Sequence, residues 1–441
     1  MTTVQDPEPI FPHELRDAWP ALSRDERVES FKLVPHSTAD DFFLSLSAQE
    51  QSELILAMAP GERRTWMRLL APDDAVDVIQ DSPPHSRESL LSELDESTRR
   101  EVQALLAYEE DDAGGLMNPR FARVRPEMTI DEAITYLRKQ TREKVETVYY
   151  AYALNSQQHL LGVVSLRQLF QAAPTKRVEE VMIRDIITVS EDMDQEAVSH
   201  VFSEQGLMAI PVVDAEKRMK GIVTVDDIVQ VVQEEATEDI QKVGGMEALD
   251  APYFEVGFLA MLRKRAGWLL VLFLGEMLTA TAMGFFEHEI ARAVVLSLFI
   301  PLIISSGGNS GSQATTLIIR SLALTEVRLK DWWRVARREV ASGVALGAVL
   351  GSVGILRIMV WQSVFHNYGE HAWKVALTVG FSLVGVVTWG TLSGSMLPFV
   401  LRRAGFDPAS ASAPFVATLV DVSGLVIYFS VASTILRGTL L

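Results

Sequence analysis

Long apolar runs separated by short polar loops fill the second half of the chain. Five such segments follow residue 262, at Gly267–Phe286, Ala291–Ile319, Val340–Trp361, Val375–Val400 and Ala413–Leu436. Each is long enough to cross a hydrocarbon layer of about 30 Å as an α-helix. The polar surface between them is too small for them to be buried helices of a large soluble domain. The pattern predicts a five-helix, all-α transmembrane domain over residues 263–441.

Basic residues in the connecting loops orient these spans. They cluster before the first span, between spans two and three, and between spans four and five, at residues 263–265, 328–338 and 402–403. Short loops rich in Lys and Arg stay on the cytoplasmic side. The N-terminal segment MTTVQDPEPIFPHEL lacks the apolar core of a signal peptide. We therefore expect cytoplasmic N-terminal domains and a C-terminus outside.

The first part of the chain alternates short amphipathic runs with regularly spaced prolines. Ala-Pro or Pro-Pro pairs recur at residues 59–60, 71–72 and 83–84. The runs between them predict short helices, with Asp73 and Ser86 as N-caps. We expect an N-terminal extension over residues 1–35 and an acidic, all-α helical-repeat domain over residues 36–115. An ordinary helical bundle is the alternative.

An internal repeat occupies residues 116–233. The segment that starts at Leu116 resembles the one that starts at Val181, at an offset of 65 residues, and Leu160–Ala172 resembles Met219–Val231 at an offset of 59. The later segment of each copy reads as a strand, a Ser or Thr cap and a helix. This is the pattern of tandem cystathionine-β-synthase-type (CBS) domains, which are α/β.

The second copy contains a candidate nucleotide site. Its sequence GIVTVDD, residues 221–227, resembles the ribose contact of adenosine nucleotide sites through Thr224 and Asp227. The first copy has Gln168 at the acidic position, and an amide accepts paired ribose hydroxyls less well than a carboxylate. We expect at most one good adenosine site per chain. Helix capping by Thr224 with a solvated Asp227 is the alternative.

Charge is distributed unequally along the chain and excludes several classes of function. Residues 1–250 contain 25 basic and 48 acidic side chains, whereas residues 251–441 contain 15 and 10. Nucleic acid needs a positive footprint, so it is not the expected partner. The chain has no cysteine, which excludes disulfides and thiolate metal sites, and its histidines are scattered. A hard cation bound by oxygen atoms remains open.

Polar residues interrupt the second span at residues 301–317. Gly307 and Gly308 weaken a helix there and expose carbonyl groups. Neutral side-chain oxygens are added by Asn309, Ser312 and Gln313. Irregular polar backbone at membrane depth is tolerated only where protein or water covers it. We interpret the segment as the lining of a pore, with close packing through small residues as the alternative.

Asp421 is the only ionisable acid in the fifth span, and Thr418 lies one turn before it. A charge at this depth costs at least ~2.5 kcal/mol, so a functional role is the default hypothesis. A structural hydrogen bond to a neighbouring helix is the alternative. Glu276 in the first span is a weaker case: it could line the same path, but a packing or interfacial role is equally reasonable. One carboxylate with neutral oxygens suits a hydrated hard cation such as Mg²⁺, and two chains sharing a pore would supply two.

An acidic linker, residues 234–262, connects the two halves. Its acids are Glu234, Glu235, Glu238, Asp239, Glu247, Asp250 and Glu255. Divalent ions that bridge these acids to the soluble domains would compact the cytoplasmic half, and without ions like charges would drive the domains apart. A plain solvated surface is the alternative.

Taken together, the order of these parts resembles the MgtE family of bacterial magnesium channels over roughly residues 40–441. The most specific motifs are SGGNSGSQATTLIIR and PFVATLVDVSG. The resemblance implies a homodimer in the lipid of the bacterial cytoplasmic (inner) membrane, with a pore on its two-fold axis lined by spans two and five. Asp421 would bind hydrated Mg²⁺ there, and residues 307–309 would line the same path. Mg²⁺ would enter the cytoplasm down its electrochemical gradient.

The resemblance also implies cytoplasmic Mg²⁺ sites that lock a closed state. By position, the sensor acids would be Asp214, Glu216, Asp226, Glu247, Asp250 and Glu255, with Asp95 as a further candidate. The segment after Asp250 would be a plug helix, and ATP would bind at Thr224 and Asp227. Relatives can carry Asn where this chain has Ala413, which puts a peripheral ion contact in doubt.

Two alternatives stay open at this point. One is a channel for other divalent cations such as Co²⁺ or Ni²⁺, which the lack of cysteine and clustered histidine disfavours. The other is a non-conducting, membrane-anchored sensor of nucleotide or Mg²⁺, which would have no need of Asp421. An enzyme is not expected, because the chain shows no base–nucleophile arrangement and no GxxxxGK[ST] motif.

Overall fold

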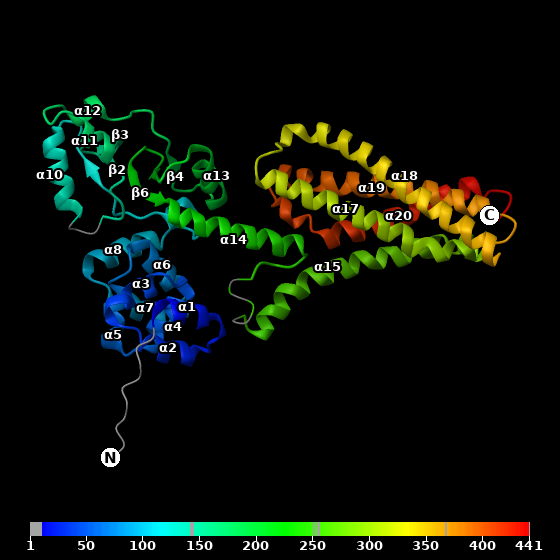
Figure 1. Cartoon of the computed structure of the whole chain (residues 1–441), viewed down its shortest axis with the longest axis horizontal. Helices are drawn as coiled ribbons and strands as arrows, with labels where there is room; N and C mark the ends of the chain where they lie inside the picture. The colour runs from blue at the N-terminus through cyan, green and yellow to red at the C-terminus, as the bar shows by residue number, and fades with distance from the viewer. Residues whose placement is uncertain are drawn as a thin grey trace, which may run out of the picture. The chain divides into compact units, whose positions relative to one another are not determined.

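The computed structural model describes residues 11–141, 145–249, 251, 253, 256–366 and 368–440. The chain divides into two compact units, Met1–Gln233 and Glu234–Leu441. The first unit contains short helices and two small sheets, and the second contains long helices (Figure 1). Helix α14 (Val225–Val243) runs across the division.

Short helices build the N-terminal part of the first unit. They are α1 (Pro12–Ala18), η1 (Trp19–Ala21), α2 (Arg24–Phe31), α3 (His36–Leu44), α4 (Ala48–Ala57), α5 (Pro60–Met67), α6 (Pro72–Gln80), α7 (Pro84–Glu93) and α8 (Glu96–Leu105). Helices α1 and α2 fall in the range predicted as an extension, and they contribute Leu15 and Phe31 to the same core as Phe43 and Ile79. This core also reaches the second CBS copy through Ile210.

The recurring prolines begin helices. Helices α5, α6 and α7 each have Pro at the first helical position, after the N-cap residues Ala59, Ala71 and Pro83. Proline suits this position because its fixed φ is helical and the missing N–H would have no partner there. The prediction of Asp73 and Ser86 as N-caps was therefore wrong. Asp73 lies inside the first turn of α6 and is only 8% exposed.

The two CBS copies have the same topology. Their strands are β1 (Arg123–Val124), β2 (Tyr150–Leu154) and β3 (Leu160–Ser165), then β4 (Val189–Ser190), β5 (Ala209–Val213) and β6 (Met219–Thr224). In each sheet the first pair is parallel and the second antiparallel, with a register shift at the end of the middle strand. The accompanying helices are α9 (Ala113–Leu116), α10 (Ile130–Gln140), α11 (Leu166–Gln171), α12 (Val178–Val181) and α13 (Gln195–Gln205).

Each CBS copy sends its leading segment to the other copy's sheet. Asn118 bridges to Ile222 of β6, and Ile183 bridges to Val163 of β3. Glycines make room for both crossings. A Cβ added at Gly221 would lie 2.8 Å from the Asn118 carbonyl oxygen, and one at Gly162 would clash with Met182. The equivalent contacts follow the offsets of 65 and 59 residues, which confirms the predicted repeat.

The second unit is built from five long helices in the order the apolar pattern predicts (Figure 1). Its elements are α15 (Phe258–Phe285), α16 (Glu287–Arg292), η3 (Val294–Phe299), α17 (Ile300–Ala323), η4 (Leu329–Asp331), α18 (Trp332–Phe365), α19 (Ala372–Arg403), η5 (Pro408–Ser410) and α20 (Ala413–Ile435). Helices α15 and α18 begin before the predicted apolar segments because the helix also includes the basic stretches, residues 263–265 and 334–338, that precede each apolar run. The five predicted spans are confirmed.

Small residues bring α17 and α19 into close contact. A Cβ at Gly390 would lie 2.3 Å from the Gly307 carbonyl oxygen, and one at Gly394 would lie 2.3 Å from that of Gly311. Thr315 Oγ1 donates to the Gly394 carbonyl at 2.9 Å. Small-xxx-small pairs of this kind let membrane helices approach backbone to backbone. Helix α19 is accordingly the most buried of the five spans.

Candidate functional site

Asp421 lies half-buried on α20, which packs antiparallel to α17. A Cβ added at Gly311 would lie 2.8 Å from Val416 Cγ1, and one at Gly307 would lie 2.8 Å from Val420 Cγ1. These contacts fix the register of the two helices. Asp421 follows Val420 directly, so it lies within about one helical turn of the Gly307 level on α17.

Gly307 and Gly308 lie inside a continuous helix, contrary to the irregular backbone expected from sequence. Both residues are buried, and Gly308 faces Ala417 of α20. Their carbonyl groups belong to the helix ladder of α17. Close packing against α19 and α20 accounts for Gly307, because a Cβ there would lie 2.5 Å from Val386 Cγ1 and 2.8 Å from Val420 Cγ1. A Cβ at Gly308 would make only ordinary contact with Ala417, at 3.4 Å.

The polar side chains of α17 fall into two groups. Ser312 Oγ donates to the Ala413 carbonyl at 3.2 Å and so joins α17 to the start of α20. Asn309 and Gln313 are exposed on the surface of the single chain. Together with two exposed hydroxyl residues they form a polar stripe along one side of α17, at positions i, i+4, i+8 and i+11. The stripe consists of Ser305, Asn309, Gln313 and Thr316. A polar stripe on a membrane-spanning helix requires a partner other than lipid.

Asp421 has a carboxyl neighbour. Its side chain shares a hydrogen bond with that of Glu276 on α15. Thr418, one turn earlier, donates to the Pro414 carbonyl at 3.1 Å, and its methyl group faces Gly275. From sequence, a pore-lining role and a packing role were equally reasonable for Glu276, because the register of α15 against α20 cannot be read from a single sequence.

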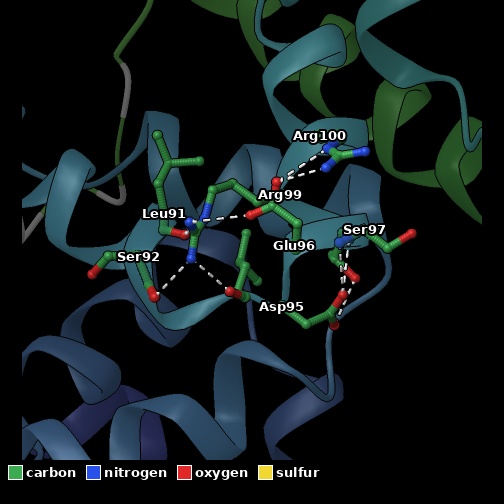
Figure 2. Close-up of polar contacts among 9 residues, drawn as sticks. Leu91, Ser92, Asp95, Glu96, Ser97, Arg99 and Arg100 are labelled. Carbon is green, nitrogen blue, oxygen red and sulfur yellow. Dashed lines mark hydrogen bonds and ion pairs between the residues drawn. The ribbon is translucent and has the colours of Figure 1, made fainter.

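Asp95 is the N-cap of α8 (Figure 2). Its carboxylate accepts from the Ser97 and Thr98 amides, both at 3.1 Å, and from Thr98 Oγ1 at 3.0 Å. These bonds, the Thr98 amide first, hold the pKa of Asp95 below its usual range. The nearby Arg99 donates to carbonyl groups at the end of α7, and Arg100 pairs with Glu96. Capping accounts for the position of Asp95 without any ion.

Asp214 and Glu216 lie in the turn between β5 and β6. Asp214 accepts from the Arg218 amide at 2.8 Å and lies 3.4 Å from Lys220 Nζ. Burial raises the pKa of Asp214, but these bonds outweigh it and hold the pKa below its usual range. Glu216 is fully on the surface of the turn. Asp214 is thus already paired within its own hairpin, whereas Glu216 is open to solvent.

Thr224 and Asp227 form a capping box at the start of α14. Asp227 Oδ2 accepts from Thr224 N at 3.1 Å and from Thr224 Oγ1 at 2.6 Å. Thr224 also contacts Asp226, which is exposed. Ser165 and Gln168 form the matching box in the first copy. The capping alternative for this pair is therefore present in the structure, although Asp227 is half-buried rather than solvated.

Sequence reasoning missed an acidic cluster between α6 and the CBS copies. Asn118 Nδ2, fully buried, donates to Asp73 Oδ1 at 3.0 Å and to Glu146 Oε2 at 2.8 Å. Burial first, and then the neighbouring carboxylates, raise the pKa of Asp73 well above its usual range. Partial desolvation and the same neighbours raise the pKa of Glu146, whose residue stays partly open to solvent, to about 7. Burial raises the pKa of Asp227 to about 6 against the lowering effect of its hydrogen bonds from Thr224. The cluster joins residues far apart in sequence, so no local motif marks it.

The linker carries the last group of candidates. Glu247 is exposed, and its amide donates to the Lys264 carbonyl at 3.2 Å. Asp250 and Glu255 lie outside the described residues. Across the described part of the chain, no three Asp, Glu or His side chains converge as direct ligands of one ion. An ion held through its water shell does not require such convergence.

Comparison with known proteins covers each part of the chain. The family model described as divalent cation transporter, MgtE, matches residues 300–431, the MgtE intracellular N domain matches residues 10–111, and the CBS domain matches residues 113–174 and 178–234. A crystal structure of the cytosolic domain of the Mg²⁺ channel MgtE in complex with ATP is 38% identical, with a TM-score of 0.47; the match covers 50% of this chain and 90% of that one.

Curated relatives extend this similarity over nearly the whole length. The magnesium transporter MgtE of Thermus thermophilus is 39% identical over 434 residues, which is 98% of this chain and 94% of the relative. The magnesium transporter MgtE of Bacillus subtilis is 29% identical over 92% of this chain and 88% of the relative. With the helical N domain, the CBS pair and the five spans in the same order, this multi-pass membrane protein belongs to the MgtE family of magnesium transporters and is not an enzyme.

Proposed function

We propose that this chain forms a homodimeric channel that lets Mg²⁺ into the cytoplasm down its electrochemical gradient. The observation that carries the proposal is Asp421, a half-buried carboxylate within the span α20. It lies at the level of Gly307 on the neighbouring helix α17, which carries the exposed polar stripe. The stripe Ser305–Thr316 needs cover in the membrane, and a second copy of the chain supplies it with a matching polar surface. The two Asp421 side chains then face one aqueous path.

The neutral oxygens of the stripe suit an ion that keeps its water. Mg²⁺ sheds its hydration shell reluctantly, so amide and hydroxyl groups such as those of Asn309 and Gln313 would contact water rather than the ion itself. The absence of cysteine disfavours softer ions such as Co²⁺ and Ni²⁺ as preferred cargo. The membrane potential drives entry with ~2.3 kcal/mol per charge at 100 mV.

We further propose that cytoplasmic Mg²⁺ closes the channel. The cluster of Asp73, Glu146 and Asp227 supports this, because the carboxylates repel one another and a divalent cation relieves the repulsion. The family resemblance adds Asp95, Asp214, Glu216, Asp226, Glu247, Asp250 and Glu255 as sensor acids. Of these, Glu216, Asp226 and Glu247 are exposed and open to a hydrated ion.

An adenosine nucleotide is the proposed ligand of the CBS pair. The relative whose cytosolic domain binds ATP supports this, and Thr224 and Asp227 are the candidate ribose contacts. Because both belong to a capping box, Asp227→Asn is the appropriate variant, since Asn keeps an acceptor for the Thr224 amide. Titration of the full chain with ATP should show weaker binding in Asp227→Asn, and unchanged affinity would reject the contact.

Patch recordings test conduction and closure together. We expect Mg²⁺ current at low cytoplasmic Mg²⁺ that closes as cytoplasmic Mg²⁺ is raised to about 10 mM, the weak end of oxygen-site affinities. Asp421→Ala should abolish the current while the protein stays folded. Full current in this variant would reject the pore assignment. A current in the unaltered protein that ignores cytoplasmic Mg²⁺ would keep the pore and reject the sensor.

A further inference from the structure

Helix α15 lies along α20 in a parallel direction, and three contacts fix the register. Trp268, ten residues after the start of α15, donates through Nε1 to Oγ of Ser412, the N-cap of α20, at 3.0 Å. A Cβ at Gly275 would lie 2.9 Å from Thr418 Cγ2. Near their ends the rings of Phe286 and Phe429 stack at 4.8 Å between centroids. Because Gly275 has no side chain, α15 comes close to α20 just before Asp421.

Glu276 is placed by this register. It follows Gly275, and its carboxyl group shares a hydrogen bond with that of Asp421. No Lys, Arg or His of the described residues forms an ion pair with either carboxylate. Two neighbouring carboxylates without a basic partner, inside spans, need a cation or a shared proton. A structural pair would normally combine opposite charges.

Thr279 provides an independent observation on the same side of α15. Its side chain is 7% exposed, and Oγ1 is buried without a hydrogen-bond partner. The hydroxyls of Thr281 and Thr418, in contrast, donate to the carbonyl four residues earlier. At roughly 100° per residue, Thr279 falls between Gly275 and Glu276 around the helix axis, so it is directed toward α20 and the Asp421 level. Buried hydroxyl groups are normally hydrogen-bonded, so an unpartnered one indicates a place where a ligand or its water can bind.

We propose that Glu276 is a second ion-binding carboxylate beside Asp421, and that the Thr279 hydroxyl contacts the water shell of the ion held between them. The proposal rests on the pore assignment of Asp421. In this arrangement two carboxylates of one chain, on α15 and α20, balance the charge of one divalent ion. Glu276 therefore sets the preference for divalent over monovalent cations, since a single carboxylate satisfies K⁺ or Na⁺ equally well.

The test uses the full chain in liposomes, with Mg²⁺ uptake measured against external Mg²⁺ and the permeability of K⁺ measured in parallel. Glu276→Gln should raise the half-saturating Mg²⁺ concentration about tenfold, because it removes one charge-assisted contact. It should also raise the permeability of K⁺ relative to that of Mg²⁺. Glu276→Asp, which keeps the carboxylate, should stay near the unaltered protein in selectivity. Thr279→Val should raise the half-saturating concentration by a smaller factor.

Matched controls separate ion binding from structure. Glu339→Gln removes an acid of α18 and Thr281→Val removes an exposed hydroxyl of α15, and neither should change either readout. If Asp421→Ala abolishes uptake but Glu276→Gln shows unaltered half-saturation and selectivity, the second carboxylate is rejected and the pore stands. If Asp421→Ala retains uptake, the pore assignment itself fails. If Glu276→Gln and Glu276→Asp both aggregate in size-exclusion chromatography, the carboxyl pair is only a structural contact and the proposal is overturned.

Discussion

Lys242 Nζ lies 2.6 Å from Asp407 Oδ2 and also contacts Glu238. Lys242 lies in the last turn of helix α14, whereas Asp407 is the N-cap of η5, just before α20. Burial lowers the pKa of Lys242, but the bonds to Asp407 and Glu238 outweigh it and raise the pKa above its usual range. Lys242 therefore stays charged at physiological pH. The pair ties the end of the linker helix to the start of the span that carries Asp421.

We expect Lys242→Met to impair closure by cytoplasmic Mg²⁺ more than conduction. A part-exposed ion pair contributes about 0.5–1 kcal/mol, so the Mg²⁺ concentration for half closure should rise about two- to fivefold. Patch recordings at stepped cytoplasmic Mg²⁺ measure this. The exchange Lys242→Glu with Asp407→Lys should restore much of the closure. If Lys242→Met closes at the original concentration, the pair has no part in gating.

We expect Gly390→Ala to destabilise the membrane unit. The new Cβ would lie 2.3 Å from the Gly307 carbonyl oxygen, which is backbone and has little freedom to move. Overpacking of this kind costs about 1–3 kcal/mol. Gly284→Ala is the matched control, because nothing lies within 4 Å of its added Cβ. Thermal unfolding in detergent should show a lower midpoint for Gly390→Ala only, and equal midpoints would contradict the close packing.

Features that depend on a local pattern were predictable from sequence. Apolar length alone located the five spans, and the repeated strand-cap-helix segments located both CBS copies. Capping by Thr224 was one of two interpretations open from sequence, since Asp227 lies three residues away, but that interpretation had Asp227 solvated and the structure has it half-buried. The wrong N-cap prediction for Asp73 shows the limit of such rules. Aspartate is a suitable N-cap residue, but Pro72 occupies the first helical position, so the N-cap is Ala71.

Features that depend on register between distant segments were not predictable. Glu276 meets Asp421 only because Gly275 lets α15 approach α20, and those residues are 145 positions apart. Asn118 joins α6 to Glu146 by contacts that span 45 and 28 residues. Gly307 suggested irregular backbone, because a glycine in a span can mark either a weakened helix or a close contact between helices. Only the contact with Gly390 on α19 shows that the glycine serves packing.

Capping and sensing by Asp95 predict different mutational results. Asp95→Ala removes the acceptor for the Ser97 and Thr98 amides and should lower unfolding stability by ~1 kcal/mol. Asp95→Asn keeps an acceptor but removes the charge, so stability should be nearly unchanged. Thermal unfolding and Mg²⁺-dependent closure should be measured on both variants. A sensor role requires weaker closure in Asp95→Asn, and normal closure in that variant would leave Asp95 as a cap only.

The acidic cluster predicts a stability that falls with rising pH. Asp227 and Glu146 have pKa values raised to about 6 and about 7 from ordinary values of 3.8 and 4.5. The folded state thus binds more protons than the unfolded state between about pH 4 and 7, and its stability declines across that window. Hydrogen exchange of α6 in the full chain should show less protection at pH 8 than at pH 5.5. Mg²⁺ should restore protection at pH 8, where the carboxylates are charged and need a counter-ion.

Asp73→Asn should weaken the dependence of this protection on pH and on Mg²⁺, because it removes one of the repelling charges while keeping an acceptor for Asn118. Asp131→Asn on the exposed surface of α10 should change neither. Protection that is the same at both pH values and with or without Mg²⁺ would mean that the cluster carries no net charge strain for an ion to relieve.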